Sequence, residues 1–585
     1  MTTVTTDSNN YGNENNIVIE FISCPPGYCC SNQGQRCQNI TSCNYHRQGT
    51  LCGQCTPGYH QSYFSTNCIE NSKCSTKNQR KFWTVYVFTA FLLTCVILST
   101  KDFAVVLVAF VAQVRNLFKC LKIKLFGNKD ENISRINSCI SYNNIRIKNK
   151  CLIKEEKPRQ YIFSAVLQIT LSFFQIVSLL SIRNDSDTNK MMTRMVNLFN
   201  LQLAVKQAEE FCPFEGIEII WTNFLKNVLF ILLMLLFLVI FSLIHNLICF
   251  LFCGKKAGPE YQQNSTDTEK YDDENRNTNE RVIKEAITKT YKPSLFQELL
   301  QISFTDKLIL TFIKILMFGY KNISLFTIVS LNCVKIYGEP VLYISGNIKC
   351  YQPWQWSLLA LLILWVVPFP VALVLAYRLY QKGIISKIEY ITILIFPILA
   401  FGLYFYHHGT RSRTLGPCQE GLLGALSDIF EEPYRVTQTA TEDCEIEEET
   451  LYWWTAWRLY ERLLIAVLVT FIIEPLFRMC VIAPVIAFLS ILHYQIKPYK
   501  ETMTLLSLLD ISSYVFLTFY VVDNMFRSFA YTFDLPLQNP IDRGLKLLGV
   551  FEALLTPLTV ICLFVIASIA RAVYEIVRNT AKKCE

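Results

Sequence analysis

The chain alternates between long apolar runs and polar stretches that are often basic. A helix needs about 20 apolar residues to cross a bilayer core of about 30 Å. Helices satisfy their own backbone groups in lipid, so the pattern predicts an all-α integral membrane protein built as a bundle of about nine transmembrane helices. The predicted spans are 82–100, 161–182, 221–252, 308–334, 356–378, 456–473, 478–496, 503–525 and 546–574.

The apolar run 391–406 is shorter than these spans and contains Pro397. If it crossed the membrane, the basic segment 495–500 and the basic C-terminal tail would lie on the outer side. That placement contradicts the tendency of Lys and Arg to remain in the cytosol. We therefore expect this run to be re-entrant, interfacial or buried against the bundle.

The basic residues predict the orientation of the chain. Segment 115–159 holds 12 Lys and Arg against 4 Asp and Glu, whereas segment 183–220 holds 4 against 6. The first of these loops should be cytosolic and the second extracellular. With nine spans, a cytosolic C-terminus requires an extracellular N-terminus. The first span would act as a reverse signal-anchor, and a signal peptide missing from the sequence would give the same topology.

Composition supports lipid as the solvent of most of the chain. Apolar residues make up 52% of the sequence and charged residues 17%, against about 25% charged in soluble domains. The net charge of +8 does not indicate nucleic-acid binding, because the basic residues border the apolar runs. We expect the lipid bilayer as the main partner, with an extracellular ligand and a homo-oligomer as further possibilities, and no nucleic acid.

Residues 24–80, here called the cysteine module, carry a dense set of cysteines with Pro-Gly turns. About 50 residues cannot build a sufficient apolar core, so disulfides should stabilise the module. The Cys-x2-Cys pair at 52 and 55 also suggests zinc, but no second such pair follows at finger spacing. The nine candidates are Cys24, Cys29, Cys30, Cys37, Cys43, Cys52, Cys55, Cys68 and Cys74.

An odd number of cysteines leaves one to remain free, to pair between chains, or to reach an outer-loop partner such as Cys212 or Cys350. Asn39 lies in a glycosylation sequon inside the module, and Asn184 lies in another within the second predicted loop. Both acceptors would be used only on the extracellular side.

Several stretches carry a resemblance to a known group of proteins. They are CPPGYCC (24–30), RQGTLCGQCTPGY (47–59), VNLFNLQLAVKQAEEFCPFEG (196–216), LYISGNIKCYQPWQ (342–355), YWWTAWRLYERLL (452–464) and HYQIKPYKETMTLLSLLDISS (493–513). The chain resembles uncharacterised invertebrate multipass membrane proteins whose cysteine-rich modules are labelled EGF-like or ephrin-receptor-like. From 452 onward it is also distantly similar to fungal TRP-like channel proteins, whose bundle is related in shape to the anoctamins. The second resemblance implies a fold that conducts ions or lipid.

Ionisable residues inside spans are rare and usually face a partner or a water-filled path. Arg458 and Glu461 lie at i and i+3 in the sixth span, where they could pair at the cytosolic edge or form a gate or lipid-headgroup site. Asp510 lies about 10 Å into the eighth span. It could meet His493 across the intervening turn and hold a proton or a cation, or it could be satisfied by nearby serine hydroxyls.

Two lysines of the fourth span, Lys314 and Lys321, repeat at seven residues with Lys307 and so share a helical stripe. Such a row could sense voltage or face lipid phosphates. Alternatively, the outer members snorkel toward the membrane surface and one caps a groove. Pro368 and Pro370 should kink the fifth span.

No enzymatic motif is present: there is no glycine-rich phosphate loop, no His-Glu-x-x-His and no Gly-x-Ser-x-Gly. We therefore expect neither an enzyme nor a cofactor, and no metal site. Cys249 and Cys253 beside a basic stretch are candidate palmitoylation sites at the inner membrane edge.

These patterns divide the chain into eight regions. They are a disordered segment (1–23), the cysteine module (24–80), spans one to three with a basic cytosolic loop (81–253), a disordered cytosolic loop with an amphipathic helix (254–305), spans four and five (306–382), a cytosolic or re-entrant linker (383–455), spans six to nine (456–578) and a cytosolic tail (579–585).

Two functions fit this organisation in the plasma membrane. The first is a TRP-like or anoctamin-like conduit for ions or lipid, gated or assembled through the cysteine module. The second is a cell-surface receptor or adhesion protein without transport activity. The size of the membrane part favours the conduit, because a simple anchor needs only one span.

Overall fold

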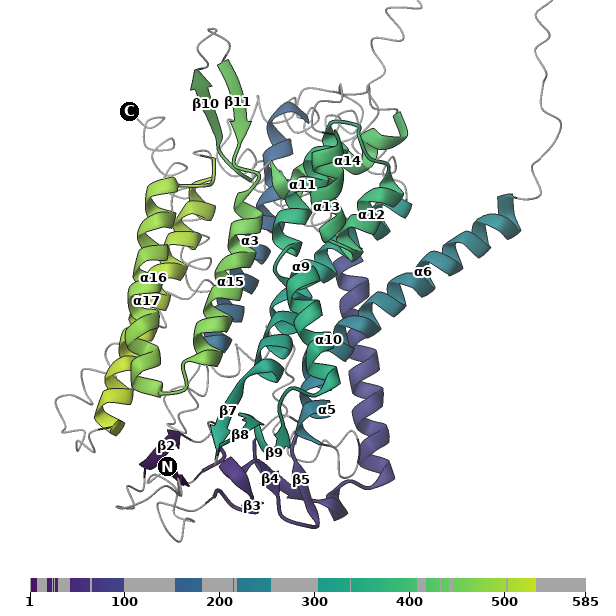
Figure 1. Ribbon diagram of the computed structural model, residues 1–585. Helices are drawn as coiled ribbons and strands as arrows, with labels where there is room; N and C mark the ends of the chain where they lie inside the picture. The colour runs from purple at the N-terminus through teal and green to yellow at the C-terminus, as the bar shows by residue number, and fades with distance from the viewer. Residues whose placement is uncertain are drawn as a thin grey trace, which may run out of the picture.

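The computed structural model shows an elongated bundle of helices with small sheets at its two ends (Figure 1). Strands β3–β5 and β7–β9 lie at one end, and β10, β11 and α14 lie at the other. The structure describes residues 2–7, 18–29 and 43–98 with short gaps, 153–180, 214, 218–253, 304–407 without 337, 417–450 with short gaps, and 451–532 without 501–502.

Six helices of the described chain are long and apolar enough to cross a membrane. Many large apolar side chains on their outer faces are exposed, as a lipid environment requires. This confirms the coarse prediction of a helical membrane protein. The six are Thr76–Leu98, Ile219–Leu247, Phe304–Leu331, Pro353–Gln381, Pro475–Ile496 and Thr504–Phe526.

Three of the nine predicted spans are not among these six. Helix α15 (Trp454–Phe471) has the length of a span but carries three charged residues. Helix α3 (Ile153–Leu180) begins with a polar turn and is apolar from Gln168 to Leu180. The predicted span 546–574 lies outside the described residues.

Helix α9 (Phe304–Leu331) is the central helix of the bundle, and it packs against α15, α6 (Phe230–Cys253) and α10 (Pro353–Leu361). Helix α15 in turn contacts α3. Its Gly319 receives the Ile231 side chain of α6, because a Cβ there would lie 2.6 Å from Ile231 Cδ1. Helices α5 (Ile219–Phe224) and α6 are joined by the π-helical turn η5 (Leu225–Leu229).

The fifth predicted span is interrupted where proline was expected to kink it. A π-helical turn, η6 (Leu362–Val366), separates α10 from α11 (Phe369–Gln381). Pro368 and Pro370 flank the start of α11, where missing N–H groups interrupt the helical ladder. The helical hydrogen bonding is thus interrupted at the two prolines, and the kink itself stays a prediction.

The run 391–406 forms parts of two short helices, α12 (Lys387–Ile395) and α13 (Ile398–His407). Phe396 leaves the helical conformation immediately before Pro397, as the steric demand of proline on the preceding residue requires. Tyr390, Ile393 and Leu394 are buried in the same core as α11. Phe396, Phe405 and Tyr406 are exposed, so only one face of the run packs against the bundle, and the choice among the three placements stays a prediction.

The end of the bundle that holds α12 and α13 also holds α14 (Pro417–Phe430) and the hairpin of β10 (Val436–Ala440) and β11 (Ile446–Thr450). Leu426 and Phe430 of α14 pack into the core beside Tyr377 of α11. The described residues of region 383–455, expected to be a cytosolic or re-entrant linker, therefore form helices and a hairpin at this end.

The cysteine module consists of short strands and turns cross-linked by disulfides. They are β3 (Arg47–Gln48), η1 (Thr50–Cys52), β4 (Gln54–Cys55), β5 (Tyr59–Gln61), β6 (Cys68–Glu70) and η2 (Asn71–Lys73). Preceding them is the hairpin of β1 (Thr2–Asp7) and β2 (Val18–Ser23).

Disulfides join Cys43 to Cys52 and Cys55 to Cys68. Cys29 and Cys74 are also disulfide-bonded. Because Cys52 and Cys55 are both oxidised, the Cys-x2-Cys pair offers no thiolates to zinc. Cys24, Cys30, Cys37 and the acceptor Asn39 lie outside the described residues.

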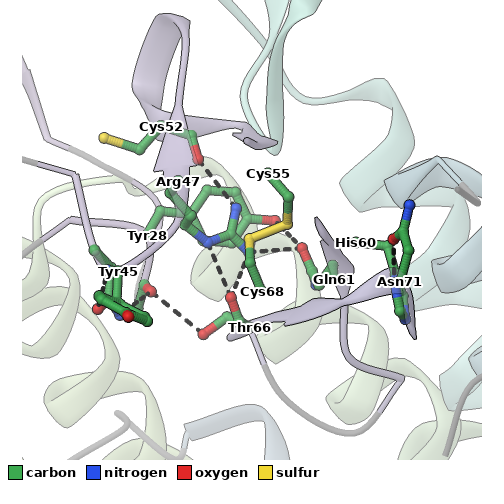
Figure 2. The surroundings of a disulfide bond; sticks show 12 residues. Tyr28, Tyr45, Arg47, Cys52, Cys55, His60, Gln61, Thr66, Cys68 and Asn71 are labelled. Carbon is green, nitrogen blue, oxygen red and sulfur yellow. Dashed lines mark hydrogen bonds between the residues drawn. A yellow bond between two sulfur atoms is a disulfide. The ribbon is translucent and has the colours of Figure 1, made fainter. Parts of the chain in front are cut away.

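Arg47 organises the interior of the module (Figure 2). Its guanidinium donates to the Cys52 carbonyl at 3.0 Å and to Gln61 Oε1 at 2.7 Å. The same group lies 3.7 Å from the ring centroid of Tyr28. Burial raises the pKa of the Tyr28 phenol, and the Arg47 charge partly opposes that shift. A buried arginine thus links residues from separate turns and strands of the module.

A three-stranded meander lies between α9 and α10 and was not predicted from the sequence. It comprises β7 (Cys333–Ile336), β8 (Glu339–Leu342) and β9 (Ser345–Lys349). A disulfide joins Cys333 to Cys350 across it. One of the sequence alternatives paired Cys350 with an unpaired cysteine of the cysteine module, and this disulfide shows that alternative to be wrong.

The cysteine module docks directly on this meander. A Cβ at Gly346 would lie 2.5 Å from the Thr50 carbonyl oxygen, and one at Gly53 would lie 2.9 Å from the Gly346 nitrogen. Leu51 is buried against Ile336 and Val341 of the meander. The module is thus packed backbone against backbone on the segment that connects two helices of the bundle.

Candidate functional site

The charged residues of α15 lie on its buried side. Arg458, Glu461 and Arg462 follow one another at i, i+3 and i+4, which places them on one face of the helix. All three are buried by the neighbouring helices. Burying charge without partners is costly, so other helices must supply counter-charges.

Helices α16 (Pro475–Ile496) and α17 (Thr504–Thr532) supply them. They pack as an antiparallel pair, and His493 Nδ1 lies 2.7 Å from Asp510 Oδ2. The predicted meeting of these two residues across the turn is confirmed. The alternative in which serine hydroxyls satisfy Asp510 is not what the structure shows, because Ser512 and Ser513 donate to the Leu509 carbonyl instead.

Arg458 and Glu461 find their partners on these helices. Arg458 Nη2 lies 3.2 Å from Asp510 Oδ1, and Glu461 Oε1 lies 2.7 Å from His493 Nε2. The predicted pairing of Arg458 with Glu461 along one helix is replaced by two pairings between helices. We call Arg458, Glu461, His493 and Asp510 the charge cluster; their exposed fractions are 6%, 2%, 1% and 1%.

Two tyrosines add hydrogen bonds to the charge cluster. Tyr514 donates its hydroxyl to Glu461 Oε2, and the Tyr499 hydroxyl accepts from Arg458 Nη1 at 2.9 Å. Tyr499 lies in the turn between α16 and α17, where burial raises the pKa of its phenol well above the usual value. Its hydroxyl therefore stays protonated and neutral beside the arginine.

The ring of Tyr434 stacks on Tyr499, whose hydroxyl contacts Arg458 of the charge cluster. Arg435 N donates to the Pro498 carbonyl at 2.7 Å, and Lys500 N donates to the Pro433 carbonyl at 3.3 Å. Segment 433–435 is thus fastened to the turn 498–500. We call this contact the clasp.

A second group of polar contacts extends from the charge cluster toward the middle of the bundle. Arg462 donates to Ser172 Oγ at 3.1 Å and to Gln175 Oε1 at 2.9 Å, both on α3. Lys321 of α9 donates to Ser178 Oγ at 3.1 Å on the same helix. Polar residues at three-residue spacing on α3 therefore connect α15 with α9.

The predicted lysine row divides in the structure. Lys321 is buried against α3, whereas Lys314 is only half-buried on α9. The contact with Ser178 satisfies Lys321 inside the bundle, which differs from the snorkelling expected for the outer members of the row.

Several side chains of the candidate site were not identified from the sequence. Tyr514 and Tyr499 belong to the hydrogen-bonded set, and Ser172, Gln175 and Ser178 line α3. The spacing of the last three residues is a helical stripe of polar positions in an apolar span, and that stripe was the available signal.

The remaining predicted sites are only partly covered. Cys249 and Cys253 lie in the last turns of α6, and nothing further is described of their side chains. The glycosylation acceptor Asn184 lies outside the described residues. Among the described residues, no group of three or more His, Cys, Asp or Glu side chains forms a candidate metal site.

The charge cluster joins α15, α16 and α17 through charged groups removed from solvent. The polar contacts of Arg462 and Lys321 extend this connection to α3 and α9. Such an arrangement can hold a proton, bind the helices in one relative position, or release them when its charges change. No family model, no curated protein and no solved structure matches the chain.

Proposed function

We propose that the chain is a plasma-membrane conduit for ions or lipid that is closed by the charge cluster. The observation that carries the proposal is the burial of Arg458, Glu461, His493 and Asp510 between α15, α16 and α17. In lipid, ionisable side chains are costly and typically mark ion paths, proton relays or gates. Apolar packing would hold these helices together without that cost.

The proposed topology places the cysteine module and the meander outside the cell and the charge cluster near the cytosol. It has nine spans, an extracellular N-terminus and a cytosolic C-terminus. The excess of Lys and Arg in segment 115–159 supports this orientation. The position of the disulfides at one end of the bundle agrees with an oxidising exterior.

A receptor or adhesion function is the second candidate, and the docking of the cysteine module favours it. The module contacts the meander through Gly53 and Gly346, and the meander continues into α9 and α10. A ligand that moves the module would therefore pull on two helices of the bundle. The same connection would serve a ligand-gated conduit.

Expression in cultured cells tests the proposal. Whole-cell currents and exposure of phosphatidylserine on the outer leaflet are recorded for the wild type and for Glu461→Gln and Asp510→Asn. The conduit predicts that the wild type supports one of the two activities and that both variants change it. Asp523→Asn is the matched control, since Asp523 is a buried aspartate of α17 about 20 Å from Asp510 along the helix.

Surface labelling must first show that each variant reaches the plasma membrane. A surface-expressed wild type without current and without lipid exposure would contradict the conduit and favour the receptor. An equal effect of Asp523→Asn and Asp510→Asn would remove the charge cluster from the proposed gate.

A further inference from the structure

The imidazole of His493 is held between two carboxylates from different helices. Nδ1 lies 2.7 Å from Asp510 Oδ2, and Nε2 lies 2.7 Å from Glu461 Oε1. A neutral imidazole carries one N–H, and its other nitrogen is an acceptor. A carboxylate oxygen is also an acceptor when ionised. A neutral imidazole between two ionised carboxylates could donate to only one of them. Both contacts are hydrogen bonds only if the three side chains together hold one additional proton.

The other contacts indicate which side chain carries this proton. The second oxygen of Glu461 accepts from Tyr514, and the second oxygen of Asp510 lies beside the Arg458 guanidinium. Donors and a positive charge on these oxygens favour ionised carboxylates. The proton is therefore placed on the imidazole, which becomes an imidazolium that donates to both neighbours.

Other charged groups near the imidazole do not remove this requirement. Arg462 follows Glu461 on α15, but its guanidinium donates to Ser172 and Gln175 of α3. Lys321 donates to Ser178 farther along α3. Their positive charge opposes an added proton, whereas the two carboxylates at hydrogen-bond distance favour it. The carboxylates lie in direct contact with the imidazole, so their effect dominates at short range.

The bound proton is closed off from solvent in this conformation. The Trp454 and Tyr514 rings pack on the imidazole at centroid distances of 4.7 Å and 3.9 Å. Beyond them, the Tyr434–Tyr499 pair of the clasp covers Arg458. Proton exchange therefore requires that the clasp open or that the helices separate.

We propose that His493, Glu461 and Asp510 form a proton-binding site that the clasp seals at the end of the bundle that holds β10 and β11. The proposal rests on hydrogen-bond geometry and does not require that the chain transports anything. It assigns a ligand, one proton, to the side chains that hold α15, α16 and α17 together. It also assigns to segment 433–435 the role of controlling access to that proton.

Nitrogen-15 NMR of histidine-labelled full-length protein in lipid nanodiscs tests the site directly. At about pH 8, roughly 3% of a free imidazole with a pKa of about 6.5 is protonated. The wild type should nevertheless show one imidazolium signal, which His493→Gln removes and so assigns. Glu461→Gln and Asp510→Asn should each lose that signal, and Asp523→Asn should retain it.

A neutral imidazole spectrum for His493 in the wild type would overturn the proposal, whatever the transport assays show. An imidazolium signal that persists in both carboxylate variants would overturn the role of the carboxylates. The seal is tested by the imidazolium N–H protons, which should be visible in the wild type and lost to water exchange in Tyr499→Ala. Their persistence in Tyr499→Ala would contradict the role of the clasp.

Discussion

The buried ion pair between Arg458 and Asp510 allows a quantitative test of how the charge cluster is built. Replacing Arg458 by Met leaves Asp510 with a charge that only His493 offsets, and it removes the donor to Tyr499. Removing one partner of a buried pair costs about 3–5 kcal/mol. We expect a loss of that size in the free energy of unfolding of Arg458→Met.

The double variant Arg458→Met/Asp510→Asn removes both charges and should recover most of this loss. We expect it to be at least about 2 kcal/mol more stable than Arg458→Met, since no uncompensated charge of the pair remains. Denaturant titration of the purified protein in detergent, followed by tryptophan fluorescence, measures these values. Trp454 packs on His493 and reports on the charge cluster directly.

An exposed pair with the same separation provides the control. Lys349 Nζ lies 3.2 Å from Glu339 Oε2 in the meander, and the two side chains are 69% and 62% exposed. The corresponding cycle with Lys349→Met and Glu339→Gln should give a coupling energy of about 0–1 kcal/mol. Additive losses at Arg458 and Asp510, with a double variant as unstable as the sum of the single ones, would refute the argument.

Two further predictions concern the end of the bundle that holds the cysteine module and the meander. Gly346→Ala places a Cβ against the Thr50 carbonyl and should destabilise the docked cysteine module by about 1–3 kcal/mol, as overpacking does. Limited proteolysis of the module measures this loss of stability. The control Gly424→Ala, where a Cβ meets nothing within 4 Å, should leave the proteolysis of the module unchanged. Replacing Cys333 and Cys350 together by Ala opens a loop with a sequence separation of 17 and should cost about 3 kcal/mol. Unchanged thermal stability of that variant would contradict a stabilising role for the disulfide.

The apolar pattern identified the membrane helices because lipid imposes length and composition on any segment that crosses it. It also predicted the contact between His493 and Asp510, because a short turn between two helices forces them to pack as an antiparallel pair. The partner of Glu461 could not be predicted in this way. That choice depends on how α15 packs against α16, which sequence spacing along one helix does not encode.

The meander and its disulfide were missed for a different reason. Its strands are short and mixed in polarity, and they directly follow an apolar helix, so they read as the end of a span. The predicted fourth span accordingly ran to residue 334, whereas α9 ends at Leu331. The docking glycine Gly346 likewise has no local signal, because its partner Thr50 lies far away in sequence.

The central claim about topology is that the cysteine module lies outside the cell and that the end of the bundle nearest the charge cluster faces the cytosol. Two epitope tags test it most directly, one at the N-terminus and one in segment 441–445, between β10 and β11 in the sequence. We predict that the N-terminal tag binds antibody on intact cells and that the second tag binds only after permeabilisation. If both tags are accessible from the same side, or if their accessibility is reversed, the proposed orientation of the cysteine module and the charge cluster is contradicted.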